Sequence, residues 1–182
     1  MISDQELFVL SYYRASELAG AMLFGRLAFH TSIDAYRVPL TEHSMEEAQH
    51  AWLWTKVIRD LGHTPLKVTH TYQTEYGKLF GMPQNILEIF GLTQILEHRA
   101  LEHFHRHLAL PNTHPLVKDT LKKMIEDETG HIGWIRRELD VHAKEHGRES
   151  LTAMMEKLKR MDDEVYAKLS QQPSFTDFFN TL

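Results

Sequence analysis

The chain contains no cysteine among its 182 residues. This absence excludes disulfide bonds, thiolate zinc sites, iron–sulfur clusters and cysteine nucleophiles. Proline and glycine are scarce as well, with six and nine residues, so few positions would interrupt a helix. The 13 histidines are the one unusual count, and we expect them to lie at the surface or to bind metal.

The sequence also lacks a long apolar run and a cluster of basic residues. Its most apolar stretch, residues 18–29, contains Arg26 and is shorter than the roughly 20 residues that span a bilayer. A net charge of −5 without a basic patch predicts no nucleic-acid partner. The first residues resemble no signal peptide. We therefore expect a cytoplasmic protein with no membrane partner.

Hydrophobic periodicity predicts an all-α fold. Apolar residues recur at spacings of three and four in five segments, at about residues 4–30, 44–61, 83–110, 113–146 and 150–169. Ser3 is predicted to cap the first helix, Pro83 and Pro115 to open the third and fourth helices, and Gly147 to end the fourth. The segments between the first three helices, residues 31–40 and 62–82, are predicted as connections, the second with a short helical turn near Tyr76. About 20 extended residues could return along a helix, as in bundles with one long crossover.

We accordingly predict one domain over residues 1–182, which is an ordinary size for a single core. A four-helix bundle would occupy about residues 4–146, and an extra C-terminal helix and tail would occupy residues 150–182. The tail carries Phe175, Phe178 and Phe179, which we expect to dock on the bundle or on a second subunit.

Two stretches each place a histidine three residues after a glutamate: Glu47 with His50, and Glu128 with His131. Positions three apart lie on one face of a helix about one turn apart. Each stretch could therefore direct a carboxylate oxygen and an imidazole nitrogen to one point. Both stretches lie on the apolar stripes of their predicted helices.

The preceding helices each add one glutamate on an apolar stripe, Glu17 and Glu97. Glu102 competes with Glu97, but Glu97 has apolar neighbours one and two turns away whereas Glu102 has Arg106. The two other acid-x-x-His matches, Asp60 to His63 and Glu102 to His105, are expected to be solvated surface.

The two halves of the chain repeat this pattern. Phe24 and Arg26 follow Glu17 at the same distances as Phe104 and Arg106 follow Glu97. The interval from the lone glutamate to the Glu-x-x-His stretch is 30 residues in the first half and 31 in the second. Internal repetition of this kind favours one pseudo-symmetric site between two helical hairpins.

Burying four carboxylates and two imidazoles without a counter-charge would cost many kcal/mol. Metal ions are the natural counter-charge. A hard, oxygen-rich ligand set without sulfur suits iron or manganese better than zinc or copper(I). The sequence therefore predicts a dinuclear metal site with six ligands: Glu17, Glu47, His50, Glu97, Glu128 and His131.

Several other residues keep two interpretations. Glu46 and Asp127 are either acceptors for the imidazole N–H groups or solvated carboxylates. Tyr13 is either a redox group or a core residue. Trp54 and Trp134 are expected in the core. The third-helix histidines are expected at the surface rather than in a second metal site: His98, His103, His105 and His107.

The residues 124–134, with the motif Glu128-Thr129-Gly130-His131, resemble the fourth helix of bacterioferritin. The resemblance to the ferritin-like superfamily extends over residues 5–145 and is specific at the six ligands. It implies a four-helix bundle with a di-iron centre that reacts with dioxygen. By this template Glu17 and His50 would serve one ion, Glu97 and His131 the other, and Glu47 and Glu128 would bridge both.

The chain departs from bacterioferritin at Ala48, where that family has a methionine that binds haem. The resemblance therefore implies two iron ions, with manganese as an alternative in one or both positions, and no haem by that route. The longer C-terminal part also argues against a hollow shell of many subunits.

Three functions fit this pattern. The first is a non-haem di-iron or Fe/Mn oxidoreductase that activates dioxygen to oxidise a small organic substrate. The alternative is a ferroxidase or iron-storage protein for which ferrous iron is the substrate. The third is a binding module with a structural metal. We expect a homo-oligomer, most simply a dimer formed through the apolar C-terminal helix.

Overall fold

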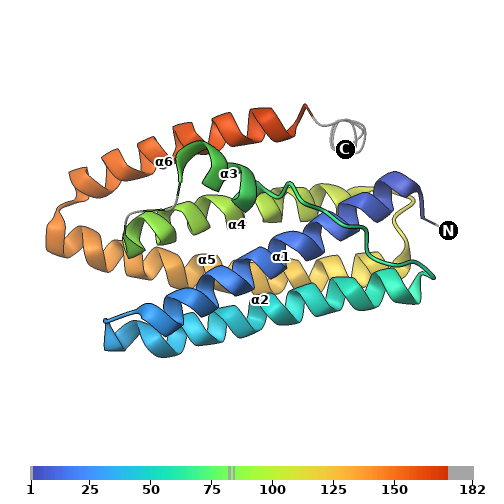
Figure 1. Cartoon of the computed structure of the whole chain (residues 1–182), viewed down its shortest axis with the longest axis horizontal. Coiled ribbons are helices and arrows are strands. Elements are labelled where there is room, and N and C mark those ends of the chain that lie inside the picture. The colour runs from blue at the N-terminus through green and yellow to red at the C-terminus, as the bar shows by residue number, and fades with distance from the viewer. Residues whose placement is uncertain (1, 82, 84, 172–182) are drawn as a thin grey trace. The chain divides into compact units, whose positions relative to one another are not determined.

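The computed structural model describes residues 2–81, 83 and 85–171. All regular secondary structure in that part is helical, so the predicted all-α class is confirmed. The helices are α1 (Asp4–His30), α2 (Asp34–Asp60), α3 (Tyr72–Phe80), α4 (Ile86–Ala109), α5 (Pro115–His146) and α6 (Arg148–Leu169) (Figure 1). Within the described residues, we find no helix whose length and apolar character would let it cross a lipid bilayer.

The chain divides into two compact units. The N-terminal unit holds α1, α2 and the chain as far as Thr74, and the C-terminal unit starts at Glu75 and continues through α6. The ferritin-like bundle and the single domain both remain predictions. The predicted docking of Phe175, Phe178 and Phe179 falls outside the described residues.

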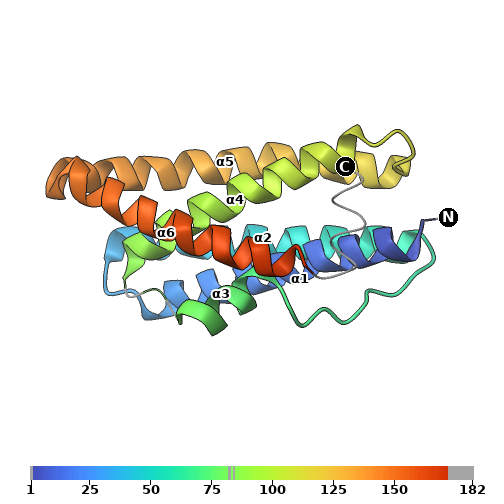
Figure 2. The same ribbon diagram turned by 90° about the horizontal axis from the view of Figure 1, so that it is seen from above.

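In the N-terminal unit, α1 and α2 form an antiparallel hairpin (Figures 1 and 2). The predicted cap of α1 is confirmed, since Ser3 Oγ accepts a hydrogen bond of 3.1 Å from the Glu6 N–H. Ser44 Oγ donates to the Ala21 carbonyl at 2.8 Å, and Arg14 Nε donates to Thr55 Oγ1 at 2.7 Å. These bonds fix how the two helices face each other.

The start of α2 differs from the prediction. Residues 31–40 were expected as a connection with a helix from about residue 44, but the connection is only residues 31–33 and α2 contains Pro39. A proline inside a helix removes the hydrogen bond to the carbonyl four residues earlier. That carbonyl belongs to Ala35, which is exposed, so water can bind it and the helix continues.

After α2 the chain runs back along α1. This agrees with the predicted long connection, as far as the N-terminal unit extends. The Leu66 N–H donates to Ser11 Oγ at 3.0 Å, and the Tyr72 N–H donates to the Tyr12 hydroxyl at 3.0 Å. The expected short turn near Tyr76 is the nine-residue helix α3.

In the C-terminal unit, α4 and α5 form a second hairpin (Figure 2). Pro83 was expected at the first position of α4, but that helix begins at Ile86, where the Asn85 side chain accepts hydrogen bonds from two backbone N–H groups. Pro115 opens α5 as predicted. Gly147 ends α5 with a φ of 95°, a conformation that favours glycine, and α6 follows at once.

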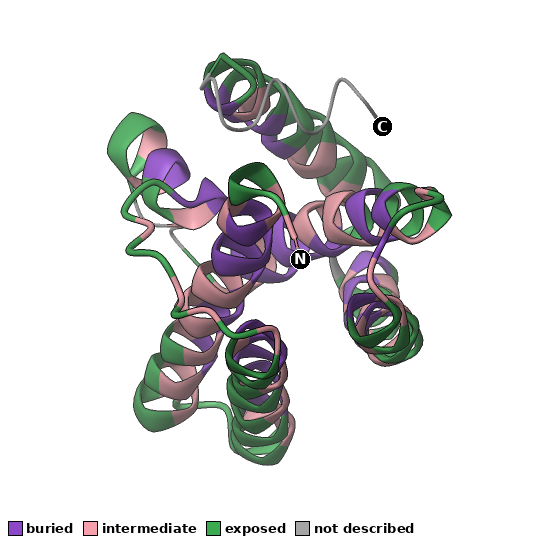
Figure 3. Ribbon diagram, turned by 90° about the vertical axis from the view of Figure 1, so that its right-hand side faces the viewer, coloured by how far each residue is buried: buried purple, intermediate pink, exposed green. Residues whose placement is uncertain are grey.

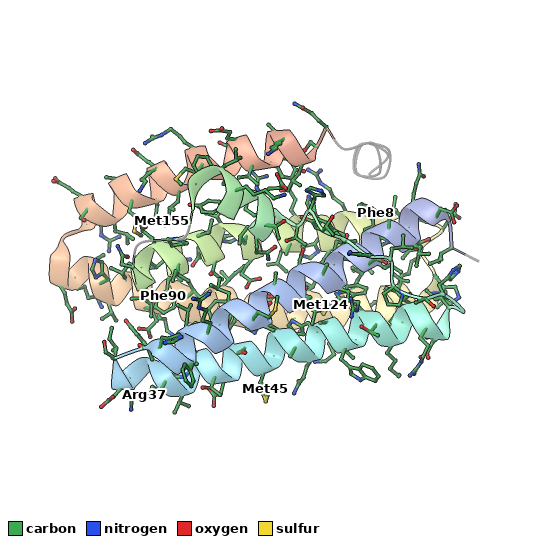
Figure 4. All side chains as sticks on the ribbon, in the orientation of Figure 1. Phe8, Arg37, Met45, Phe90, Met124 and Met155 are labelled. Atoms are coloured by element: carbon green, nitrogen blue, oxygen red, sulfur yellow. The ribbon has the colours of Figure 1, made fainter. Side chains whose placement is uncertain are left out.

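Helix α6 packs closely on α4. A Cβ atom at Gly91 would lie 2.7 Å from Leu158 and 3.0 Å from the sulfur of Met155 (labelled in Figure 4). The helices show buried positions on one side and exposed positions on the other (Figure 3). Leu158, Val165 and Leu169 of α6 are buried in the chain, whereas Met154 and Met161 on the same apolar stripe are partly exposed. The dimer itself stays a prediction.

Candidate metal centre

The N-terminal hairpin brings three predicted ligands together. Glu17 comes from α1, and Glu47 and His50 come from α2; their exposed fractions are 6%, 6% and 2%. One ligand atom of each lies within 4.8 Å of the others. His50 Nδ1 is 3.7 Å from Glu17 Oε2. The three side chains can therefore bind the same ion.

The absence of a side chain at Gly20 leaves the space that the carboxylate of Glu47 occupies. It lies on α1 one turn after Glu17, and a Cβ atom built at Gly20 would be 2.1 Å from Glu47 Oε2. Any larger side chain at this position would therefore displace the carboxylate. Sequence reasoning missed Gly20, because the sequence does not show which residue of α2 lies opposite it.

His43 is a further donor that sequence reasoning missed. It is 3% exposed, and its Nε2 lies 3.4 Å from Glu47 Oε1. The signal was available: His43, Glu47 and His50 have the i, i+4, i+7 spacing of one helix face. It was missed because the helix was predicted to start one residue after His43.

The C-terminal hairpin brings together the other three predicted ligands. Glu97 comes from α4, and Glu128 and His131 come from α5. His131 Nδ1 lies 2.9 Å from Glu128 Oε2 and 3.9 Å from Glu97 Oε1. All three are buried, with Glu128 only 1% exposed. This hairpin thus repeats the two carboxylates and one imidazole of the first.

The rival glutamate has surface surroundings. Glu102 is exposed and bound by Arg106 one turn later, and His105 is also exposed. Asp60 is exposed too and forms a contact of 3.2 Å with Arg59. These residues fit the expectation that their acid-x-x-His matches are solvated.

Asp127 and Tyr13 lie near the predicted ligands in the sequence, and each has other contacts in the structure. Lys123 Nζ lies 2.8 and 3.1 Å from the two oxygens of Asp127, on the exposed side of α5. Tyr13 is buried, 5.2 Å from the ring of Trp54, and burial raises its pKa well above the ordinary value. The phenol of Tyr13 therefore keeps its proton at neutral pH. A redox reaction of Tyr13 would have to remove the proton and an electron together.

The expectation for the third-helix histidines was partly wrong. His98 and His105 are exposed, but His103 and His107 are buried. His103 Nε2 lies 3.2 Å from the Tyr166 hydroxyl of α6, and the two rings stack. Burial, helped by the positive charges of Arg106 and Arg99, lowers the pKa of His103 to about 4. The prediction failed for His103 because α6 folds back over this part of α4.

The donor set fits a metal. Each hairpin buries two carboxylates and an imidazole, and each of these carboxylates has a histidine nitrogen within 3.9 Å. Carboxylates in such positions repel one another unless a cation or a proton joins them. Hard divalent ions that accept oxygen and imidazole ligands meet this need.

No family model, curated protein or solved structure matches this chain. The chemistry of the centre therefore has to be inferred from its own residues.

Proposed function

We propose that the two hairpins together hold two iron ions, or one iron and one manganese, in a ferritin-like bundle, and that the protein is an oxidoreductase that uses dioxygen to oxidise a small organic substrate. One observation carries this proposal. In each hairpin, two glutamates and one histidine are buried in the chain and have ligand atoms in reach of one another. A repeated set of this kind is the ligand pattern of dinuclear carboxylate centres.

The six side chains would divide the work by position. Glu17 and His50 would bind one ion, and Glu97 and His131 the other. Glu47 and Glu128 would bridge both. When bound, such a pair of ions supplies electrons for the reduction of dioxygen.

The surrounding residues exclude water from the ligands. Phe24 follows Glu17 by two turns, Phe104 follows Glu97 by two turns, and Trp54 follows His50 by one turn. All three are at most 2% exposed. A dry environment strengthens each charge–charge interaction at the ligands and protects an oxidising site from side reactions.

The test is an anaerobic ferrous titration of apo-protein, followed by an air pulse and a count of iron per chain. We expect about two tightly bound irons per pair of ligand sets and a transient visible absorption after the pulse. Uptake of many more irons would make iron itself the substrate, as in a ferroxidase. Two irons that do not react with dioxygen would make the metal structural.

Matched variants tie the result to the site. Glu47→Gln and Glu128→Gln should each lose stable iron binding, because a bridging carboxylate is removed. Glu42→Gln on α2 and Glu126→Gln on α5 change exposed glutamates of the same helices and should bind iron like the wild type. Equal binding by all four variants would show that the assigned ligands are wrong.

A further inference from the structure

We propose that His43 is a seventh metal ligand, which binds an ion held by Glu47. This inference rests on the proposed function and adds a third imidazole to the centre. His43 and Glu47 lie on α2 one turn apart, and their nearest ligand atoms are 3.4 Å from each other. Two donor atoms at this separation can bind one cation between them.

The helix gives His43 the same direction as the assigned ligands. Because α2 begins at Asp34, His43 is well inside the helix. It precedes Glu47 by four residues and His50 by seven, so the three side chains form one stripe. The stripe faces α1, since the ring of His43 lies 3.8 Å from that of Phe24.

Packing alone does not require an imidazole at this position. The two hairpins correspond with a shift of 81 residues between Glu47 and Glu128, which aligns His43 with Met124. Met124 is fully buried in the C-terminal hairpin and serves there as an ordinary apolar side chain. A buried imidazole costs more to desolvate than a methionine, so its presence beside Glu47 indicates a polar task.

The task we infer is coordination, with a consequence for metal preference. Carboxylates suit manganese, whereas imidazole suits iron, copper, nickel and zinc. A third imidazole therefore favours iron over manganese at the ion that His43 binds. Hydrogen bonding to Glu47 alone would position that carboxylate without changing the number of nitrogen ligands.

Cobalt(II) loading of the full chain under nitrogen distinguishes these roles. A cobalt-bound imidazole keeps one N–H proton, whose NMR signal is strongly shifted by the paramagnetic ion and disappears in D₂O. We expect three such signals in the wild type and two in His43→Met. The methionine copies Met124 and should preserve the fold. His43→Gln, a polar replacement, should also show two.

Two further variants calibrate the count. His50→Gln removes an assigned ligand and should lose one signal. His30→Gln changes an exposed histidine of α1 and should keep all three. Cobalt affinity should fall at least tenfold in His43→Met, but outer-shell partners can cost as much, so the number of signals decides.

The outcomes separate the two proposals. Two signals in the wild type, unchanged in His43→Met but reduced in His50→Gln, would overturn the role of His43 and leave the dinuclear centre intact. No cobalt uptake, or uptake that His50→Gln does not alter, would overturn the proposed function itself.

Discussion

The two hairpins bury the same ligand types at corresponding positions. Glu97 follows Glu17 by 80 residues, and Glu128 and His131 follow Glu47 and His50 by 81. The aromatic rings two turns after the lone glutamates are buried in both hairpins, Phe24 at 2% and Phe104 at 1% exposure. What the hairpins share is thus the ligand set and the apolar wall beside it.

The surroundings of the shared set differ. The N-terminal hairpin has His43 and Gly20 where the C-terminal hairpin has Met124 and Ala100. The C-terminal hairpin instead carries α6, which packs on α4 and α5. The N-terminal hairpin thus adds a histidine and space next to the ligands, whereas the C-terminal hairpin adds a packed helix away from them.

We expect the largest loss of stability on removing the ion pair that joins α6 to α4. Arg99 Nε of α4 lies 2.8 Å from both oxygens of Asp162, which is 2% exposed. Asp162→Ala leaves the guanidinium without this partner, and breaking a buried pair costs about 3 to 5 kcal/mol. Chemical denaturation followed by circular dichroism measures the loss.

The matched control for this pair is the neighbouring exposed aspartate. Asp163 contacts Arg99 at 3.1 Å with 62% of its side chain exposed. Asp163→Ala should cost at most about 1 kcal/mol. Equal losses in the two variants would mean that α6 is held by its apolar side chains rather than by the buried pair.

A second difference between the hairpins is sensitivity to acid. His103 corresponds to Leu23 in the N-terminal hairpin, so only the C-terminal hairpin buries a titratable group here. The pKa of His103 is about 4 in the folded chain and 6.5 in the unfolded chain. The unfolded chain therefore takes up the proton first, and stability that is present above pH 6.5 is lost as the pH falls toward 4.

The size of this loss follows from about 1.4 kcal/mol per pKa unit, which gives up to about 3 kcal/mol. The measurement is the unfolding free energy of the wild type and His103→Phe at pH 7 and pH 4.5. Phenylalanine can stack on Tyr166 but cannot bind a proton. The variant should therefore lose less stability than the wild type between these pH values. An identical loss in the two proteins would show that protonation of His103 is not its cause.

The sequence predicted those elements whose ends have local signals. Ser3 caps α1, and Pro115 and Gly147 bound α5. The choice of Glu97 over Glu102 rested on apolar neighbours four and seven residues away, and the burial of Glu97 agrees with it. Local helix geometry suffices for such inferences, because residues on one stripe share one environment.

Other features depend on contacts between helices and could not be predicted locally. Pro39 suggested that the second helix begins after it, but α2 includes Pro39 because the exposed carbonyl of Ala35 can bind water. Since the predicted helix began too late, His43 was not considered as a ligand. The burial of His103 depends on α6 turning back at Gly147. The contact of Gly20 with Glu47 depends on the register of α1 against α2.

The smallest expected effect tests that register. In Gly20→Ala the new Cβ would meet Glu47 Oε2 at 2.1 Å, and the flexible carboxylate rather than the helix must move. We expect iron affinity to fall about 10- to 100-fold, or about 1.4 to 2.7 kcal/mol, while helix propensity offsets any loss of stability by up to about 1 kcal/mol. Isothermal titration under nitrogen measures the affinity.

Two alanine–glycine exchanges complete this test. Gly130→Ala on α5 has nothing within 4 Å of its new Cβ and should bind iron normally. Ala100→Gly gives the C-terminal hairpin the glycine of the other, and should cost about 1 kcal/mol of stability without changing affinity. If Gly20→Ala bound iron as tightly as Gly130→Ala, iron binding would not depend on the position of the Glu47 carboxylate against α1. His43 would then be the one functional difference between the ligand sets of the two hairpins.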